Sequence, residues 1–209
     1  MGDWVTEDLY QHVTEPLLVV ISGPSGVGKD SVVHCLKECG YPFHFVVTAT
    51  SRPPRAGEVH GVDYFFVSER EFERLIVADE LIEHALVYGQ YKGVPKQQVR
   101  EALASGKDVL MRLDVQGAAT VRQLAPEAVL IFLSPSSEEE LVARLRQRQG
   151  DTEAQLAHRI QMIREEMRCL PLFDYVVVNR DGKLDAAAEQ VAMIMQVEHL
   201  RTHPRRVRL

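Results

Sequence analysis

The feature that most constrains this chain is a glycine-rich segment between an apolar run and a helical run. The run Leu17–Ile21 is short, apolar and rich in β-branched residues, which is typical of a buried parallel strand. It is followed by Gly23-Pro-Ser-Gly-Val-Gly-Lys29, and Asp30–Glu38 has the pattern of a helix. A strand, a glycine-rich turn and a helix in this order bring backbone N–H groups together around a phosphate. A tight glycine turn without a ligand is the weaker interpretation, because the whole context is intact.

The loop predicts a binding site for the phosphates of ATP. Lys29 would place a full positive charge at the β- and γ-phosphates, and the helix start adds a partial one. The residue after this lysine is commonly Ser or Thr, whose hydroxyl faces Mg²⁺, but here Asp30 and then Ser31 follow. Asp30 and Ser31 could ligate Mg²⁺, or Asp30 could be a carboxylate that complements the helix dipole. The expected ATP-binding residues of this segment are Gly23, Pro24, Ser25, Gly26, Val27, Gly28, Lys29, Asp30 and Ser31.

Strand-like and helix-like segments alternate along the rest of the chain. This order predicts an α/β fold, a mostly parallel sheet flanked by helices on both faces. The polar segment Thr50–Asp63, rich in Pro and Gly, is expected to be a long functional loop. The other expected strands are Phe43–Thr48, Tyr64–Val67, Leu81–Tyr88, Asp108–Leu113, Ala128–Leu133 and Tyr175–Val178. The other expected helices are Ser68–Ala78, with Ser68 as N-cap, then Lys96–Ala104, Val115–Leu124, Glu138–Gln147, Gln155–Arg168 and Leu184–Leu200.

Composition excludes several classes of protein. The 209 residues are 45% hydrophobic and 26% charged, as in an ordinary globular domain. The longest apolar runs are far shorter than the roughly 18–20 residues that span a bilayer, and three cysteines make no disulfide framework. The net charge of −6 argues against bulk binding to nucleic acid or to a membrane surface. The acidic N-terminal 16 residues resemble neither a secretory signal nor a transit peptide.

A second motif runs Thr50-Ser-Arg-Pro-Pro-Arg-Ala-Gly-Glu-Val-His-Gly-Val-Asp-Tyr64. Arg52 and Arg55, three residues apart in a proline-stiffened loop, can converge on one dianion, and the Tyr64 hydroxyl can join them. Taken alone, such a pair of arginines would favour a solvated basic turn.

Together, the two motifs closely resemble the guanylate kinase family, and the resemblance runs from Leu17 to about Leu200. It implies one domain, 1–209, with a P-loop nucleoside monophosphate kinase fold. The core would comprise 17–47, 97–133 and 171–200, with a GMP-binding subdomain at 48–96 and a lid at 134–170. The basic tail Arg201–Leu209 is expected to be a solvated, frayed end.

The resemblance also assigns roles to individual residues. It implies that Arg52, Arg55 and Tyr64 bind the GMP phosphate, and that Thr48, Glu83 and Asp114 line the guanine pocket. A carboxylate such as Glu83 can accept from N1–H and the amino group of guanine, whereas adenine has no N1–H. On the ATP side the resemblance places Asn179 beside the adenine. It makes Lys29, Arg144, Arg148 and Arg159 the catalytic cations.

Four positions depart from the commoner family pattern. They are Asp30, Lys92, Val94 and Arg112. The combination of Gly-Lys-Asp30 with Gln-Tyr-Lys92-Gly resembles the organellar branch of plant guanylate kinases, found in plastids and mitochondria. Lys92 stands in place of a phosphate-binding tyrosine and can supply a stronger charge to the GMP phosphate. Arg112 near Asp30 could offset the added carboxylate. Val94 replaces a small hydroxyl residue that often touches guanine.

The function that this resemblance implies is Mg²⁺-dependent transfer of a phosphoryl group from ATP to GMP, and also to dGMP. The alternatives are a non-catalytic guanylate-kinase-like module that binds a phosphopeptide, and a kinase for another monophosphate. The expected partners are GMP and ATP, with no nucleic acid and no membrane, in a monomer or weak dimer. The expected location is the plastid or the mitochondrial matrix, with the cytoplasm as the alternative.

Overall fold

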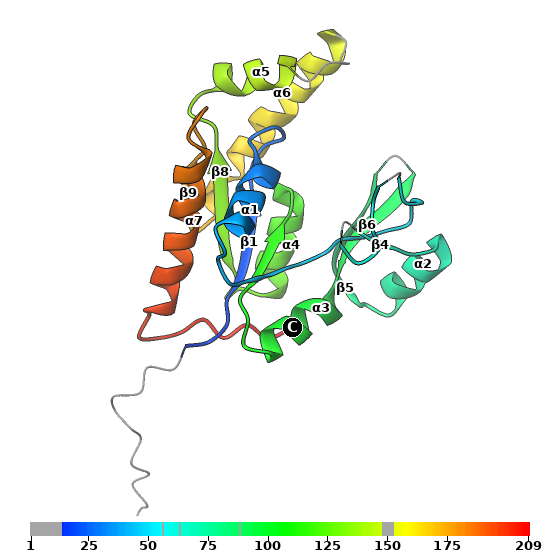
Figure 1. Ribbon diagram of the computed structural model, residues 1–209. Helices are drawn as coiled ribbons and strands as arrows, with labels where there is room; N and C mark the ends of the chain where they lie inside the picture. The colour runs from blue at the N-terminus through cyan, green and yellow to red at the C-terminus, as the bar shows by residue number, and fades with distance from the viewer. Residues whose placement is uncertain (1–13, 56, 63, 88, 148–152) are drawn as a thin grey trace, which may run out of the picture.

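Two β-sheets organise the part of the chain that the computed structural model describes, residues 14–55, 57–62, 64–87, 89–147 and 153–209 (Figure 1). The larger sheet has five strands in the order β2-β7-β1-β8-β9, and every neighbouring pair in it is parallel. Its strands are β1 (Leu18–Ser22), β2 (His44–Phe45), β7 (Val109–Arg112), β8 (Val129–Ser134) and β9 (Tyr175–Val178). The predicted mostly parallel α/β sheet is therefore confirmed, and β1 lies at its centre.

Both faces of this sheet are covered by helices. Leu17, Val19 and Ile21 pack with α1 (Lys29–Glu38) and α7 (Leu184–His199). Leu18 and Val20 point to the opposite face, toward α3 (Lys96–Ala104) and α4 (Val115–Leu124). A strand buried on both faces must be apolar at every position, which is why its sequence shows no alternation.

The smaller sheet stands to one side of the larger one (Figure 1). Its strands follow the order β4-β3-β6-β5 and mix parallel and antiparallel pairs. They are β3 (Ala49–Thr50), β4 (Phe65–Phe66), β5 (Leu81–Val87) and β6 (Gln90–Pro95), and helix α2 (Glu69–Val77) packs against them. The Ser68 hydroxyl caps α2 by accepting from the Glu71 N–H at 3.1 Å, so the predicted N-cap is confirmed.

The predicted strand Phe43–Thr48 is wrong as a single element. The chain gives His44–Phe45 to the larger sheet and Ala49–Thr50 to the smaller one. Between them, the Gln98 side chain accepts from the Val47 N–H at 2.8 Å and donates to the Val47 carbonyl at 2.6 Å. This side chain satisfies both backbone groups of Val47, so the segment can pass between the sheets without a strand partner.

Strand β6 was not predicted from the sequence. Gln90–Pro95 contains a glycine and a proline and has no apolar alternation, so it lacks a strand signal. Its strand conformation comes from antiparallel pairing with β5, and the Tyr91 ring stacks on Phe72 at a centroid separation of 5.1 Å. The partner strand and the ring packing therefore override the weak local preference.

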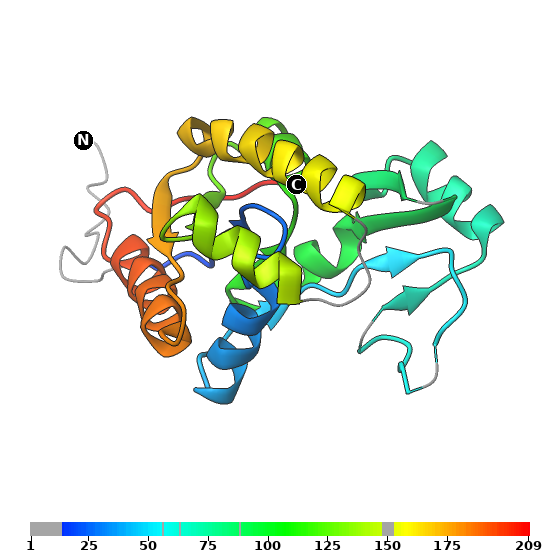
Figure 2. The ribbon, with the colours of Figure 1, turned by 90° about the horizontal axis from the view of Figure 1, so that it is seen from above.

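Two helices lie over the carboxyl end of the larger sheet, α5 (Glu138–Gln147) and α6 (Glu153–Arg168) (Figures 1 and 2). Leu141, Leu145 and Ile163 form the small apolar cluster between them. The 3₁₀ turn η1 (Leu170–Leu172) then leads into β9. Within the described ranges, no helix combines the length and the apolar character that crossing a membrane requires.

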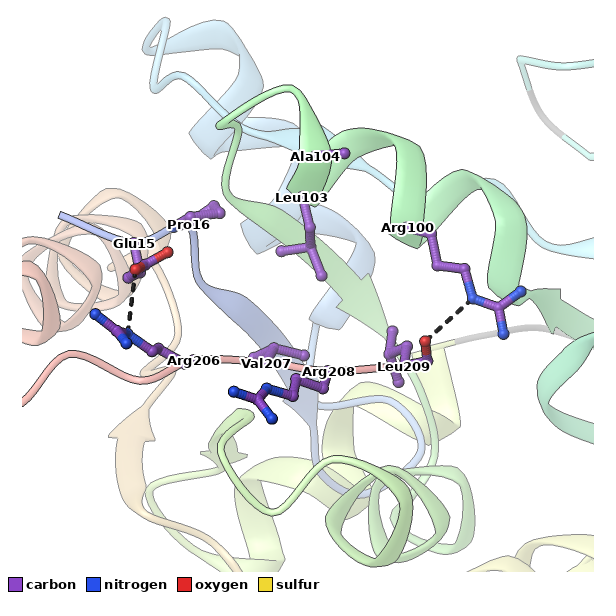
Figure 3. Close-up of a pocket in the computed structure, with 9 residues that line it drawn as sticks. All are labelled: Glu15, Pro16, Arg100, Leu103, Ala104, Arg206, Val207, Arg208 and Leu209. Carbon is purple, nitrogen blue, oxygen red and sulfur yellow. Dashed lines mark hydrogen bonds and ion pairs between the residues drawn. The ribbon is translucent and has the colours of Figure 1, made fainter.

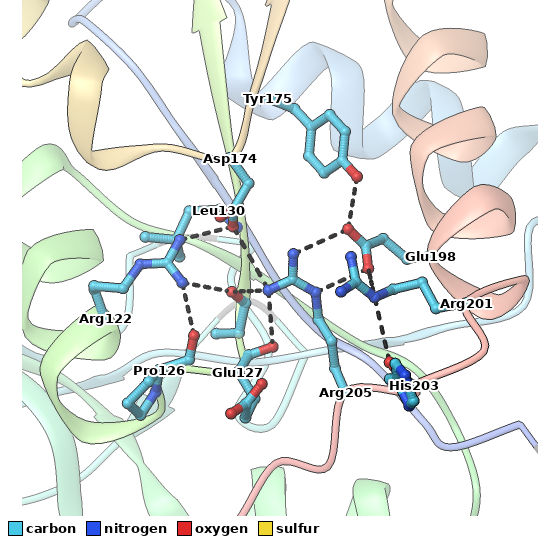
Figure 4. A network of polar contacts seen from close by, with 11 residues as sticks. Arg122, Pro126, Glu127, Leu130, Asp174, Tyr175, Glu198, Arg201, His203 and Arg205 are labelled. Atoms are coloured by element: carbon cyan, nitrogen blue, oxygen red, sulfur yellow. Dashed lines mark hydrogen bonds and ion pairs between the residues drawn. The ribbon is translucent and has the colours of Figure 1, made fainter.

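The basic tail is docked rather than frayed, so the expectation of a solvated end was wrong. Arg205 donates to the Glu198 carboxylate at 2.8 Å from Nε and at 3.0 Å from Nη2 (Figure 4). The Tyr175 hydroxyl donates to the same carboxylate at 2.6 Å, and Glu198 is only 2% exposed. A buried carboxylate requires such partners, and this requirement ties the tail to α7 and β9.

The end of the tail lies along α3 (Figure 3). Val207 and Leu209 pack against the apolar cluster on that side of the sheet, and Arg100 Nε donates to the Leu209 carbonyl at 3.3 Å. A cavity of about 520 Å³ lies between this segment and α3. The burial of two apolar side chains explains why a run containing four arginines does not remain in solvent.

Candidate active site

The glycine-rich loop joins the end of β1 to the start of α1 at the carboxyl edge of the larger sheet. Gly28 has φ 96°, a left-handed conformation that disfavours any side chain. A Cβ atom there would also lie 2.6 Å from Nδ2 of Asn179. The loop therefore needs glycine at this position for its backbone conformation and for the close approach of β9.

Lys29 curls back over this loop. Its Nζ donates to the Gly23 carbonyl at 2.5 Å and to the Pro24 carbonyl at 3.1 Å. Burial lowers the pKa of Lys29, while the negative charges of Glu166 and Asp114 oppose that shift. The ammonium group is thus held at the mouth of the loop, where an incoming phosphate would meet it.

A carboxylate that sequence reasoning missed lies on the same loop. The Ser25 N–H donates to Oε2 of Glu166, on α6, at 3.1 Å. Burial is the main cause of the raised pKa of Glu166, and the positive charge of Lys29 acts against it. The Glu166 oxygen accepts from a loop amide in the way that a phosphate oxygen does when it binds such a loop. The sequence gives no sign of this role, because Glu166 is one of several acidic residues in a charged helix.

Arg144 and Asn179 converge on Val27 of the loop. Arg144 Nη2 donates to the Asn179 carbonyl at 2.8 Å, its Nη1 donates to the Val27 carbonyl at 3.4 Å, and it forms an ion pair with Glu140. Asn179 Nδ2 donates to the Val27 carbonyl at 2.8 Å. The structure therefore brings one predicted lid arginine and the predicted adenine-side asparagine to the loop.

The other two lid arginines are not placed in this way. Arg159 is half-buried on α6. Arg148 lies outside the described residues. Their catalytic roles stay predictions.

A second cavity, of about 150 Å³, opens between the two sheets. It contains five of the seven residues predicted to bind GMP, although they come from separate segments of the chain. Its lining residues are Thr48, Tyr64, Glu83, Ala85, Lys92, Arg112, Leu113 and Asp114. Val94 does not line this cavity, because it is buried in the core beside α3.

Two carboxylates, those of Glu83 and Asp114, line this cavity. Burial raises the pKa of Glu83 to about 7, and the nearby Asp114 charge adds to the effect. Asp114 is the N-cap of α4, where its Oδ1 accepts from the Gly117 N–H at 2.8 Å. The helix cap fixes Asp114, whereas Glu83 is a desolvated acceptor.

Arg52 is held beside the cavity by Glu58. Its Nη1 and Nη2 donate to the two carboxylate oxygens at 2.6 and 2.5 Å, and the guanidinium lies 4.9 Å from the ring centre of Tyr64. This pairing lowers the pKa of Glu58 to about 2. Arg55 contributes its backbone N–H to Glu58 at 2.7 Å, while its side chain is exposed. The structure therefore holds the side chain of Arg52 in place beside the cavity. The convergence of Arg52 and Arg55 on one phosphate stays a prediction.

Asp30 forms an ion pair with Arg112, so the predicted proximity of these two residues is confirmed. Ser31 is exposed in the first turn of α1. The carboxylate and hydroxyl oxygens at the loop are donors that Mg²⁺ accepts, and this ion completes its shell with water and substrate phosphates rather than with a full protein cage. The residues present therefore fit a magnesium ion, although Asp30 already has a cationic partner.

Comparison with known proteins decides the family. The family model described as guanylate kinase matches residues 15–198. The chain belongs to the guanylate kinase family. It is 50% identical over 196 residues to "Guanylate kinase 2, chloroplastic/mitochondrial" of Oryza sativa subsp. japonica, covering 93% of this chain and 69% of that protein. It is 45% identical to the guanylate kinase of Nocardia farcinica, covering 89% of this chain and 96% of that one.

A solved structure agrees with the family assignment. The crystal structure of guanylate kinase from Anaplasma phagocytophilum superposes with a TM-score of 0.69 at 29% identity, covering 90% of this chain and 89% of that one. The fold is therefore that of a P-loop nucleoside monophosphate kinase, as predicted. The family and the intact phosphate loop favour an enzyme over a non-catalytic binding module.

Proposed function

We propose that this chain transfers the γ-phosphoryl group of ATP to GMP, and also to dGMP, forming ADP and GDP or dGDP. The observation that carries the proposal is the cavity that gathers Glu83, Asp114, Thr48, Tyr64 and Lys92 close to the phosphate loop. Glu83 is desolvated there and has acceptor oxygens for the N1–H and amino group of guanine. Adenine would present an acceptor to the same carboxylate, which is the basis for selectivity.

The reaction needs no covalent intermediate on the enzyme. An oxygen of the GMP phosphate attacks the γ-phosphorus of ATP, and a new P–O bond forms. The bond from that phosphorus to the β–γ bridging oxygen breaks, and its electron pair stays on ADP. Lys29, Arg144, Arg148 and Arg159 offset the charge on the transferring group, while Arg52, Arg55, Tyr64 and Lys92 hold the GMP phosphate.

On the donor side, the loop residues Gly23–Ser31 bind the phosphates of ATP and Asn179 lies at the adenine. Mg²⁺, when bound, would supply positive charge that offsets the negative charge of the ATP phosphates. Asp30 and Ser31 would hold it, directly or through water. Measuring the ATP affinity of Asp30→Ser with and without Mg²⁺ tests this assignment, because a metal-dependent gain equal to that of wild type removes Asp30 from the metal site.

A coupled ADP-release assay with GMP, dGMP, AMP, UMP and CMP tests the function. GMP and dGMP should be turned over and the other three should not. Lys29→Met should abolish turnover, while the matched variant Lys37→Met, on the same helix, should keep it. Lack of turnover of all five with intact phosphopeptide binding would favour the non-catalytic module, and turnover of a different monophosphate would reassign the substrate.

We also propose that the chain acts as a monomer or weak dimer in the plastid or mitochondrial matrix. The support for this location is the 50% identical rice relative, which is named chloroplastic/mitochondrial. Fractionation of source cells and detection of the protein with an antibody test the location, and recovery in the cytosolic fraction would contradict it.

A further inference from the structure

Arg112 stands where the two substrate sites meet. It is the last residue of β7 and pairs in register with Ile21, just before the phosphate loop. Its side chain also lines the GMP-side cavity with Lys92 and Asp114. One guanidinium is therefore shared between the edge of the phosphate loop and the acceptor cavity.

The position of this guanidinium is fixed by a residue from the donor side. Asp30 immediately follows Lys29 on α1 and forms an ion pair with Arg112. The Asp30 side chain is 78% exposed, whereas that of Arg112 is 31% exposed. The arginine is thus the inner partner, and the aspartate reaches it from the solvent side.

The charge of Arg112 acts in a partly desolvated space. Its side chain is less than a third exposed, and its ion pair with Asp30 holds it near Lys29, which precedes Asp30 on α1. Holding two cations together is unfavourable without an anion. A guanidinium has five donors, and one carboxylate oxygen leaves capacity for the oxygens of a second anion.

We propose that Arg112 binds the phosphate of GMP and that Asp30 is the positioning residue that aims it. The proposal rests on the proposed function and adds a residue that the sequence pattern did not assign to either substrate. The attacking phosphate is an anion that must approach the anionic γ-phosphoryl group. A guanidinium between the donor loop and the acceptor cavity reduces this repulsion while the new P–O bond forms.

The test compares the affinities of GMP and guanosine, measured by calorimetry on the full chain. Guanosine keeps the base and ribose but lacks the phosphate. Arg112→Gln should weaken GMP about 10- to 100-fold while leaving guanosine nearly unchanged, because a charge-assisted contact to phosphate is lost. Arg112→Lys keeps the charge without the planar fork and should weaken GMP by a smaller factor.

Asp30→Asn tests the positioning role. Alone it should reduce the preference for GMP over guanosine, and in the Arg112→Gln background it should have no further effect, because it acts through the arginine. The control is Arg206→Gln, which breaks the ion pair of an exposed arginine with Glu15, and should match wild type because Arg206 does not line the cavity that contains Arg112. Circular dichroism checks that each variant is folded.

An unchanged preference for GMP in both Arg112 variants, with wild type still forming GDP, would overturn this inference alone. An equal loss of GMP and guanosine binding would show a structural role and would also overturn it. If Arg112→Gln does not fold, Arg112→Lys decides by the same ratio. A wild-type protein that neither prefers GMP to guanosine nor forms GDP would instead overturn the proposed function, and this inference with it.

Discussion

Replacement of Glu83 by glutamine should raise the stability of this protein and lower its selectivity for GMP. The Glu83 pKa of about 7 lies above its usual value of 4.5, so the folded state holds a proton that the unfolded state releases. The carboxylate therefore costs no stability below pH 4.5. Its cost grows as the pH rises toward 7 and is complete above that.

The size of this cost follows from the shift. A displacement from 4.5 to about 7 corresponds to roughly 3 kcal/mol in the free energy of unfolding. Glu83→Gln should remove this cost, because a neutral amide pays no penalty for ionisation in the cavity. The variant should be more stable than wild type by that amount at pH 8 and nearly equal to it at pH 4.5. Urea unfolding across this pH range measures the difference.

Whereas the ionisation of Glu83 lowers stability as the pH rises, it should increase kcat/KM for GMP. The ionised fraction of Glu83 rises from about a tenth at pH 6 to about nine tenths at pH 8, so kcat/KM for GMP should rise nearly tenfold. Dividing wild-type values by those of Glu83→Gln cancels the ionisation of GMP itself. The variant should also discriminate less between GMP and AMP, because an amide can both donate and accept.

Glu73→Gln is the matched control, since this glutamate is exposed on α2 in the same part of the chain. It should alter neither profile. A ratio of kcat/KM values that stays flat from pH 6 to 8 would remove Glu83 as the base-reading group. A stability difference that does not change with pH would show that its burial has no electrostatic cost.

Three further variants probe other parts of the structure. Arg52→Ala removes the guanidinium and leaves the carboxylate of Glu58 without this partner, so KM for GMP should rise about 100-fold while KM for ATP stays nearly unchanged. Steady-state kinetics with each substrate varied measures both values, and an equal change in the two KM values would indicate a purely structural role. Gly28→Ala places a Cβ at a left-handed position, so it should lower the free energy of unfolding by about 2 kcal/mol and raise KM for ATP. An unaltered denaturation midpoint would show that alanine causes no backbone strain there. Arg205→Gln leaves the buried Glu198 with the more distant Arg201 as its remaining cation, so it should cost about 2 kcal/mol of stability without altering kcat/KM; an unchanged thermal midpoint would instead indicate a frayed tail.

The sequence predicted what local pattern and chain order control. The apolar run at β1, the glycine-rich loop and the capping of α2 by Ser68 all depend on nearby residues, and the structure confirms them. The prediction that Thr48, Glu83 and Asp114 line one cavity came from the family resemblance, and the structure places all three around one cavity. No spacing rule could have supplied it, because these residues come from three segments far apart in the chain.

The features that the sequence did not predict arise from contacts between distant segments. The strand at Gln90–Pro95 depends on its partner strand, and the break at Val47 depends on Gln98, fifty-one residues later. The docked tail depends on the buried carboxylate of Glu198, which looks like any other charged residue near the end of a helix. Similarly, the contact of Glu166 with the loop amide requires α6 to lie over the larger sheet.

The arginines of the site also resolve an apparent conflict between an acidic chain and anionic substrates. Three of them carry their own carboxylate: Arg52 with Glu58, Arg112 with Asp30, and Arg144 with Glu140. Each pair neutralises the guanidinium and fixes its direction, so less conformational entropy would be lost if the arginine binds a phosphate as proposed. The net charge of −6 therefore says little about the site. Binding of phosphates depends on where the cations are held, and these carboxylates are part of what holds them.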